Sequence, residues 1–384
     1  MKKILVIHTK YRDLGGEDIA IQNEVGFLKE FYEVEELFFK NEINNFFQQA
    51  ISFITNHNQN SVNKLNEVVE DFAPDIAYVH NTWFKGSLGI FKALEKKNIQ
   101  TVLKLHNFRY DCTRSLFSKY HFRNKDFCNA CGKKRKDMGI FNKYFLDSIF
   151  KSIFIIRYGI KYFDILKKSK LNILVLTHFH KNYLNDILQN KKLIDVFPNY
   201  IHTDNNLETM EKENYVVYAG RISEEKGVKE LIESFKKAKL KNIKLKIIGN
   251  GPQLNKLKKI FIDSNIEFLG QRNNSEVLKI ISKAQAVLTG TKLYEGQPTL
   301  LCEASSMGVV SFYPRTGGIS EFFPENYPFS YEQFNYEDLT EKLSLLENKE
   351  QIKKTEIENK EYIMNYLSKE SLLKQFEKAI TNEK

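Results

Sequence analysis

Two glutamates, Glu295 and Glu303, frame the stretch Glu-Gly-Gln-Pro-Thr-Leu-Leu-Cys-Glu. A short apolar run that ends at Gly290 precedes them, so Glu295 is expected on a loop at the carboxyl end of a strand. Pro298 favours a first helical turn, which puts Glu303 about one turn into a helix. Two carboxylates and the free N–H groups of a helix start can bind the hydroxyl-rich and anionic parts of one ligand, such as a nucleotide sugar. The alternative interpretation is a capped helix with two solvated glutamates.

Cationic side chains and glycines mark the turns that precede this stretch. Arg221 and Lys226 lie in the segment Gly220–Gly227, between an expected strand and an expected helix. A guanidinium and an ammonium at one such junction suit a pyrophosphate. The next strand runs into the turn Gly249–Gly251, which does not complete a dinucleotide fingerprint because Leu254 stands where the third glycine belongs.

The first half of the chain carries two histidines at expected strand exits. His80 follows one strand and His106 follows the next, and this edge of a parallel sheet is where ligands bind. A histidine there can hydrogen-bond a sugar hydroxyl or a reacting oxygen, although a structural role is the common alternative. Gly15 and Gly16 precede the first helix, where they fit either a phosphate or sugar contact or a purely structural turn.

Three cysteines and a histidine follow in the loop after His106. Cys128 and Cys131 have the spacing of half a zinc ribbon, with Cys112 and His121 as further candidate ligands. The spacing is irregular and no second Cys-x-x-Cys exists, so we expect no metal. With four Cys and no recognisable signal peptide, we expect a cytoplasmic protein without structural disulfides.

An aromatic and basic segment lies between residues 139 and 168. Its Phe, Tyr and Ile side chains recur at helical spacing, interleaved with Lys143, Lys151, Arg157 and Lys161. One interpretation is an amphipathic helix on an anionic membrane surface, which predicts peripheral attachment to the inner face of the cell membrane. The other interpretation is a buried aromatic stripe with solvated lysines.

Strand and helix patterns alternate through both halves, which predicts an α/β fold of two Rossmann-like domains with parallel sheets. We expect a first domain at residues 1–198, a linker at 199–213, a second domain at 214–365, and a C-terminal helix at 366–384 that returns to the first domain. The linker shows no apolar periodicity, and we expect the two domains to close about it.

Length and composition limit the classes of protein. At 384 residues, with 42% hydrophobic and 13% aromatic residues, the chain suits a two-domain globular protein. A net charge of +10 favours an acidic partner such as a nucleotide phosphate or an anionic lipid. The lysines are spread over both halves, which argues against nucleic acid as the partner. No apolar run approaches the ~18 residues of a membrane span.

Taken together, these motifs resemble the family-four retaining glycosyltransferases, nucleotide-sugar-dependent enzymes of the GT-B fold, in which two Rossmann-like domains face each other across a cleft. The motif His106-Asn-Phe-Arg, with Cys112 and the cysteine pair, is similar to a subgroup common in bacterial surface-polysaccharide assembly. The chain departs from the family at Gly296-Gln297-Pro298, where Gly-Phe-Gly is usual. The motifs that carry the resemblance are Gly220-Arg221 with Lys226-Gly227, Glu295-Gly296 with Glu303-Ala304, and Gly317-Gly318 followed by Glu321.

The resemblance implies a role for each motif. Arg221 and Lys226 would neutralise the donor diphosphate, Glu303 would bind the ribose, and Glu295 would meet the donor sugar that His106 faces. The expected catalytic residues are therefore His106, Glu295, Arg221 and Lys226, and the expected acceptor-binding residues are His80, Asn107 and Arg109. The expected donor-binding residues are Gly15, Gly16, Gly220, Arg221, Lys226, Gly249, Asn250, Gly251, Gly296, Gln297, Pro298, Thr299, Leu300 and Glu303.

Cationic side chains and helix N-termini can stabilise a leaving diphosphate without a metal ion. The chain has no Asp-x-Asp motif, which metal-dependent single-domain glycosyltransferases carry as a family. We therefore hypothesise a cofactor-free and metal-independent transfer from a UDP- or GDP-linked sugar to a glycan or lipid-linked saccharide. The acceptor would attack from the face that the diphosphate leaves.

Two other functions compete with this hypothesis. An NAD-linked oxidoreductase also has Rossmann-like halves, but the missing glycine fingerprint argues against it. A non-catalytic nucleotide-sugar sensor or scaffold would bind the same ligand without turning it over.

Overall fold

The computed structural model of the chain describes residues 1–10, 16–41, 51–52, 54–112, 148–168, 170–189, 192–201 and 211–381. The chain divides into two compact units. Unit 1 comprises Met1–Tyr200 with Leu372–Lys384, and unit 2 comprises Ile201–Ser371. The expectations that lie outside the described residues concern Gly15, Lys143, the candidate metal ligands His121, Cys128 and Cys131, and residues 202–210 of the linker.

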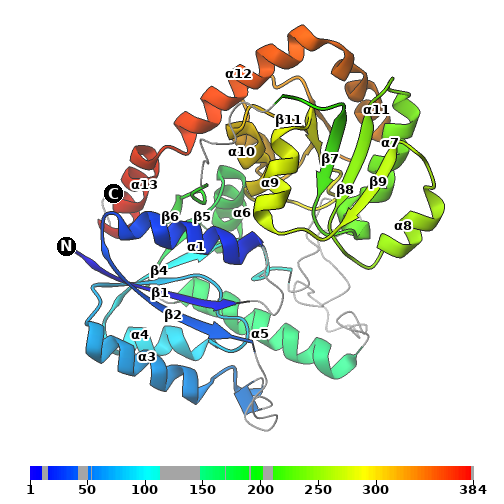
Figure 1. Cartoon of the computed structure of the whole chain (residues 1–384). Helices are drawn as coiled ribbons and strands as arrows, with labels where there is room; N and C mark the ends of the chain where they lie inside the picture. Colours follow the sequence, from blue (N-terminus) through cyan, green and yellow to red (C-terminus); the bar gives the residue numbers. More distant parts are fainter. Residues whose placement is uncertain are drawn as a thin grey trace. The chain divides into compact units, whose positions relative to one another are not determined.

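Unit 1 is built on a parallel sheet of six strands in the order β2-β1-β3-β4-β5-β6 (Figure 1). Its central strands are apolar runs, such as Ile4–Ile7, because a parallel strand is covered on both faces. The strands are β1 (Lys3–Lys10), β2 (Glu33–Lys40), β3 (Ile76–Val79), β4 (Gln100–Leu105), β5 (Leu171–Val175) and β6 (Ile194–Val196).

The described helices of unit 1 are α1 (Gly16–Lys29), α3 (Gln59–Phe72), α4 (Gly89–Lys96), α5 (Ile149–Lys168), α6 (His178–Leu188) and α13 (Lys369–Thr381). Helices α1 and α13 lie on one face of the sheet, and α3 and α4 on the other (Figure 1). Side chains fix two helix starts, since Asn58 accepts a hydrogen bond from the Ser61 N–H and Thr177 accepts one from the His180 N–H. Helix α4 was not predicted, because it has only eight residues and begins at a glycine.

Unit 2 repeats the architecture with the strand order β12-β11-β10-β7-β8-β9, again all parallel (Figure 1). The strands are β7 (Tyr215–Ala219), β8 (Lys244–Ile248), β9 (Ile266–Gly270), β10 (Ala286–Leu288), β11 (Val310–Arg315) and β12 (Ser330–Glu332). The helices are α7 (Val228–Ala238), α8 (Leu254–Ile260), α9 (Asn274–Ser282), α10 (Thr299–Ser306), α11 (Tyr336–Ser344) and α12 (Lys349–Tyr366).

The last helix, α13, completes the core of unit 1. The Phe376 ring is fully buried, with ring centroids 5.2 Å from Tyr78 and 5.3 Å from Phe197. Side-chain amides of Gln100 in β4 and Asn172 in β5 donate hydrogen bonds of 2.8 Å to carbonyls in the last turn of α13. Those carbonyls have no partner within the helix, so the amides both satisfy them and hold the helix on the sheet.

The packing of α13 predicts that Phe376→Ala destabilises unit 1 by about 3–5 kcal/mol, because it leaves a cavity among buried aromatic rings. Urea unfolding followed by fluorescence measures this, since Trp83, the single Trp of the chain, lies in unit 1. The matched control is Phe150→Ala on α5, where the ring is 75% exposed and the loss should stay below about 0.5 kcal/mol. Equal losses in the two variants would contradict the role of α13.

Candidate active site

An ion pair in unit 2 joins two of the expected catalytic residues. The ammonium of Lys226, which closes a short 3-10 turn after β7, lies 2.5 Å from Oε1 of Glu295, on the loop after β10. The Thr291 hydroxyl donates a hydrogen bond of 2.7 Å to the same oxygen. Both members of the ion pair are partly exposed, so a ligand can reach an ammonium and a carboxylate at one place.

Glycines allow the loops of this site to come close together. Gly227 is the N-cap of α7 and has φ +63°, which favours glycine, and a Cβ there would lie 2.0 Å from the Gly290 carbonyl oxygen. A Cβ on Gly249 would lie 1.9 Å from the Gly220 carbonyl oxygen. The loops after β7, β8 and β10 therefore meet backbone to backbone, which is possible because glycines stand at these turns.

Two more expected donor-binding segments join the same edge of the sheet. The Arg221 guanidinium is exposed after β7 and makes no hydrogen bond or ion pair with the described residues, while its carbonyl accepts a 2.8 Å hydrogen bond from the Tyr218 hydroxyl. Asn250 caps its own turn, since its side chain accepts a 2.8 Å hydrogen bond from the Gly251 N–H. The Gly318 N–H donates to the carbonyl of Glu295 at 2.9 Å, which fixes the backbone of the loop that carries Glu295.

Helix α10 carries the second glutamate. Pro298 stands at its N-cap, one position earlier than the first turn in which we expected it, and the helix begins at Thr299. The Thr299 N–H is bonded to the Gln297 carbonyl at 3.0 Å, so this helix start offers a ligand fewer free N–H groups than we expected. Gly296 and Leu300 flank these residues in the same loop and helix start.

Glu303 is buried inside this helix, with 6% of its surface exposed. Burial raises the pKa of its carboxyl to about 7. The carboxyl has no hydrogen bond or ion pair with any described residue. A buried carboxylate without a partner is costly, and a ligand hydroxyl that donated to it would reduce that cost.

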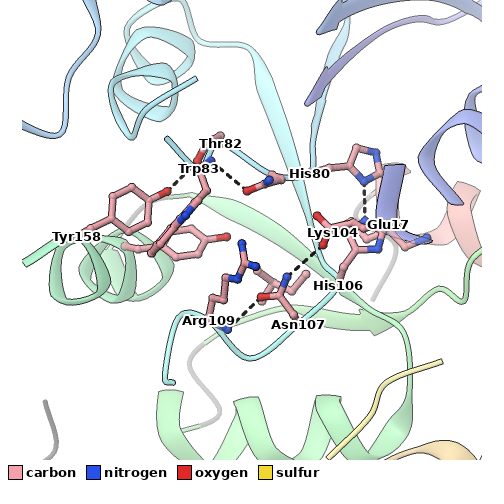
Figure 2. Close-up of a pocket in the computed structure, with 12 residues that line it drawn as sticks. Glu17, His80, Thr82, Trp83, Lys104, His106, Asn107, Arg109 and Tyr158 are labelled. Carbon is pink, nitrogen blue, oxygen red and sulfur yellow. Dashed lines mark hydrogen bonds between the residues drawn. The ribbon is translucent and has the colours of Figure 1, made fainter. Parts of the chain in front are cut away.

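Unit 1 has a pocket at the carboxyl ends of β3 and β4 (Figure 2). The Trp83 ring packs edge-on against Tyr158, with centroids 4.4 Å apart, and the Arg109 guanidinium lies 5.5 Å from the Trp83 ring. An aromatic wall with one cation beside it suits a saccharide or an anionic group. The pocket is lined by Glu17, His80, Asn81, Thr82, Trp83, Lys104, Leu105, His106, Asn107, Arg109, Tyr158 and Tyr162.

The structure brings His80, His106, Asn107 and Arg109 together in this pocket, and their role in binding an acceptor stays a prediction. Asn107 bridges two elements, because its amide donates to Glu17 of α1 at 3.2 Å and its oxygen accepts from the Arg109 N–H at 3.0 Å. Gly16 is the first residue of α1 and does not line the pocket. No group of three or more His, Cys, Asp or Glu side chains within the described ranges could hold a metal ion, and Cys112 there is buried.

A buried charged cluster beneath the pocket was not predicted. The Lys104 ammonium and the Tyr78 hydroxyl both donate to the Glu24 carboxylate of α1, and all three side chains are buried. Burial lowers the pKa of Lys104, and the pairing with Glu24 opposes that shift. A charged residue inside the apolar strand Gln100–Leu105 was the available signal, because a buried ammonium requires a partner.

Comparison with known proteins identifies the class. Residues 202–375 match the family described as "Glycosyl transferases group 1". The amylovoran biosynthesis glycosyltransferase AmsD of Erwinia amylovora is 26% identical over 196 residues, which cover 47% of this chain and 54% of that protein. A Methanocaldococcus jannaschii protein, the uncharacterized glycosyltransferase MJ1059, is 30% identical over 192 residues, covering 41% and 46%. The chain thus matches about half the length of these relatives.

Solved structures match over the whole chain. Sucrose-phosphate synthase from Thermosynechococcus elongatus has a TM-score of 0.71 at 13% identity, covering 100% of this chain and 99% of that one. Anabaena Alr3699/HepE, in complex with UDP, has a TM-score of 0.68 at 13% identity, covering both chains completely. These likenesses show the fold, and they confirm the expected GT-B class.

Residues 202–375 are thus similar to the group 1 glycosyltransferases. The chain as a whole has the GT-B fold.

The raised pKa of Glu303 predicts a pH-dependent stability. The pKa of this carboxyl is higher in the folded protein, at about 7, than the unfolded value of 4.5. The folded protein therefore loses stability as pH rises from about 4.5 through about 7. Glu303→Gln should match wild type near pH 4.5 and be more stable above pH 7, by on the order of 3 kcal/mol. Scanning calorimetry across this range measures the difference, and a difference that stays constant with pH would contradict the burial of an unpartnered carboxyl.

Proposed function

We propose that the protein is a retaining, metal-independent glycosyltransferase that uses a UDP- or GDP-linked sugar. The observation that carries this proposal is the pairing of Lys226 with Glu295 on adjoining loops of unit 2. The helix that follows the Glu295 loop, α10, carries the buried Glu303, whose carboxyl has no partner among the described residues. An ammonium suits a diphosphate, and the two carboxylates suit the hydroxyl groups of a sugar and a ribose.

The reaction follows from these placements. Arg221 and Lys226 neutralise the diphosphate as the bond between its oxygen and the sugar C1 breaks, and Glu295 orients the sugar. The acceptor oxygen forms its bond to C1 on the same face. A phosphate oxygen of the leaving group takes the acceptor proton, so the step needs no side-chain base. His106 contacts the transferred sugar, and no metal ion or cofactor takes part.

The acceptor is a glycan or a lipid-linked saccharide, bound in the pocket of unit 1. The edge-to-face rings of Trp83 and Tyr158 suit the apolar face of a sugar ring, and Arg109 with Asn107 suits its polar groups. Support for the donor comes from Alr3699/HepE, which has the same fold and binds UDP. Support for a role in bacterial surface polysaccharide comes from AmsD, a glycosyltransferase of amylovoran biosynthesis.

The test is incubation of the protein with a panel of labelled nucleotide sugars and lipid or glycan extracts. Mass spectrometry detects the transferred sugar, and NMR reports the anomeric configuration of the product. Retained configuration and undiminished turnover with a chelator are expected. Binding of a nucleotide sugar without transfer or hydrolysis would favour a sensor or scaffold instead.

Charge neutralisation of the diphosphate predicts the effect of two substitutions. Arg221→Ala and Lys226→Ala should each reduce turnover by about 30- to 1,000-fold, equivalent to about 2–4 kcal/mol of transition-state stabilisation. Donor affinity should fall less, because the charge on the leaving group grows in the transition state. Steady-state kinetics and calorimetric titration with the donor separate the two effects.

The matched control is Lys229→Ala, which removes an exposed ammonium from the first turn of α7. Turnover should be unchanged in this variant. An unchanged rate in Arg221→Ala or Lys226→Ala would remove that residue from the mechanism.

We also propose peripheral attachment to an anionic membrane through α5, on the inner face of the cell membrane. No helix within the described residues is long and apolar enough to cross a membrane. One face of α5 is buried through Ser152 and Ile155, and its other face exposes the apolar Ile149 and Phe150 with basic neighbours. Such a mixed face suits the headgroup region of a bilayer.

Vesicle sedimentation tests the attachment with the double variant Lys151→Gln/Arg157→Gln. Both side chains are exposed, whereas Lys161 donates to the Thr55 carbonyl at 3.0 Å and is left intact. Each cation near an anionic surface contributes about 1 kcal/mol, so the variant should bind anionic vesicles roughly thirtyfold more weakly at low salt.

The matched control for this experiment is Lys258→Gln/Lys259→Gln on α8, where both lysines are exposed. Its binding should equal that of wild type, and high salt should release both proteins. Equally negligible pelleting of all three proteins would return α5 to a purely structural role.

A further inference from the structure

His80 and His106 form a hydrogen-bonded pair at the floor of the unit 1 pocket (Figure 2). Nδ1 of His80 lies 2.8 Å from Nε2 of His106, and the ring planes are inclined by 29° with centroids 5.1 Å apart. A hydrogen bond between two ring nitrogens holds a single proton when both rings are neutral. One histidine must therefore donate and the other must accept.

The second ring nitrogen of His80 indicates the direction. Nε2 of His80 is buried and has no hydrogen-bond partner among the residues that the structure describes. If His80 accepted the bond, this nitrogen would carry the ring proton and become a buried donor without an acceptor, which is the rarer kind of orphaned group in proteins. If His80 donates, Nε2 is a bare lone pair, and the nearby Lys104 ammonium favours a lone pair over an N–H.

We propose that His80 is a positioning residue, whose Nδ1–H donates to Nε2 of His106 and leaves His106 neutral with its own proton on Nδ1. His106 then offers the substrate a fixed hydrogen-bond donor rather than a base. This inference rests on the proposed glycosyl transfer, in which His106 touches the transferred sugar. It agrees with a reaction in which the acceptor proton goes to the leaving phosphate.

The surroundings keep both rings neutral. Burial, followed by the charges of His106 and Lys104, holds the pKa of His80 well below its usual value, and burial with Lys104 does the same for His106. The titratable and charged groups that face the pair are His8 of β1, Asp18, Glu17 and Glu24 of α1, Tyr78 of β3, Lys104 of β4 and His180 of α6.

Those carboxylates are already engaged. Asp18 pairs with His8 at 2.8 Å, and Glu24 pairs with Lys104 and Tyr78. Glu17 accepts from the Asn107 amide. The protonation of the histidine pair is therefore governed mainly by burial and by the Lys104 ammonium, and both oppose it.

The first test needs no substrate. In protein labelled with ¹⁵N-histidine, the ring shifts of His106 should report the tautomer protonated at Nδ1, and the resonance is assigned by its absence in His106→Gln. The shifts should stay constant from about pH 6 to pH 8. An Nε2-protonated or charged His106 would overturn the inference, whatever the enzyme transfers.

The second test compares two amides at position 80. The amide nitrogen of Asn takes the place of Nδ1 and can still donate to His106, whereas that of Gln takes the place of Nε2. His80→Asn should keep turnover within about threefold and a flat pH profile. In His80→Gln, turnover should fall about tenfold, which is the value of one hydrogen bond. Its rate should also fall toward low pH, because His106 then becomes protonated.

The matched control is His180→Ala, which removes another buried imidazole of unit 1, hydrogen-bonded at 3.0 Å to the Tyr110 hydroxyl. This change should lower stability without adding a pH-dependent limb to the rate. Identical pH profiles in His80→Asn and His80→Gln would overturn the positioning role. Absence of transfer in wild type, with the expected tautomer present, would instead count against the proposed function alone.

Discussion

The parallel sheet is the constraint on which both units depend. Strands covered on both faces must be apolar along their length, so polar side chains gather where the strands end. Lys226 follows β7, Glu295 follows β10, and His80 and His106 follow β3 and β4. The glycines beside them let the connecting loops approach closely enough for side chains from separate loops to touch. The sheet topology therefore determines where polar side chains can gather, at the carboxyl ends of the strands.

The fully buried charge of Lys104 breaks this rule close to the histidines. Lys104 lies inside β4, and its cost of burial is offset by hydrogen bonds to Glu24 and by the Phe197 ring 4.3 Å away. Apolar residues would fill this volume with less difficulty, since buried ion pairs stabilise folds weakly at best. The ammonium gives the pocket a fixed positive field that uncharged residues could not supply.

The sequence predicts the architecture better than the site. Alternating apolar runs and helix caps predict both sheets, and the fold class is confirmed, but the two-turn α4 has no periodicity long enough to recognise. Strand-end positions single out His80, His106 and Glu295. The contacts of these residues depend on side-chain directions across loops, which no spacing contains: nothing in the sequence links Lys226 to Glu295 or His80 to His106.

Helix α13 affects the order in which the two units can fold during translation. Domains usually fold from the N-terminus as they leave the ribosome. Here Phe376 fills the centre of unit 1, although the whole of unit 2 is translated between them. The nascent chain can thus finish unit 2 while the earlier sheet still lacks its covering helix. Chains broken off during translation would lack this helix and leave part of an apolar sheet face open to chaperones and proteases.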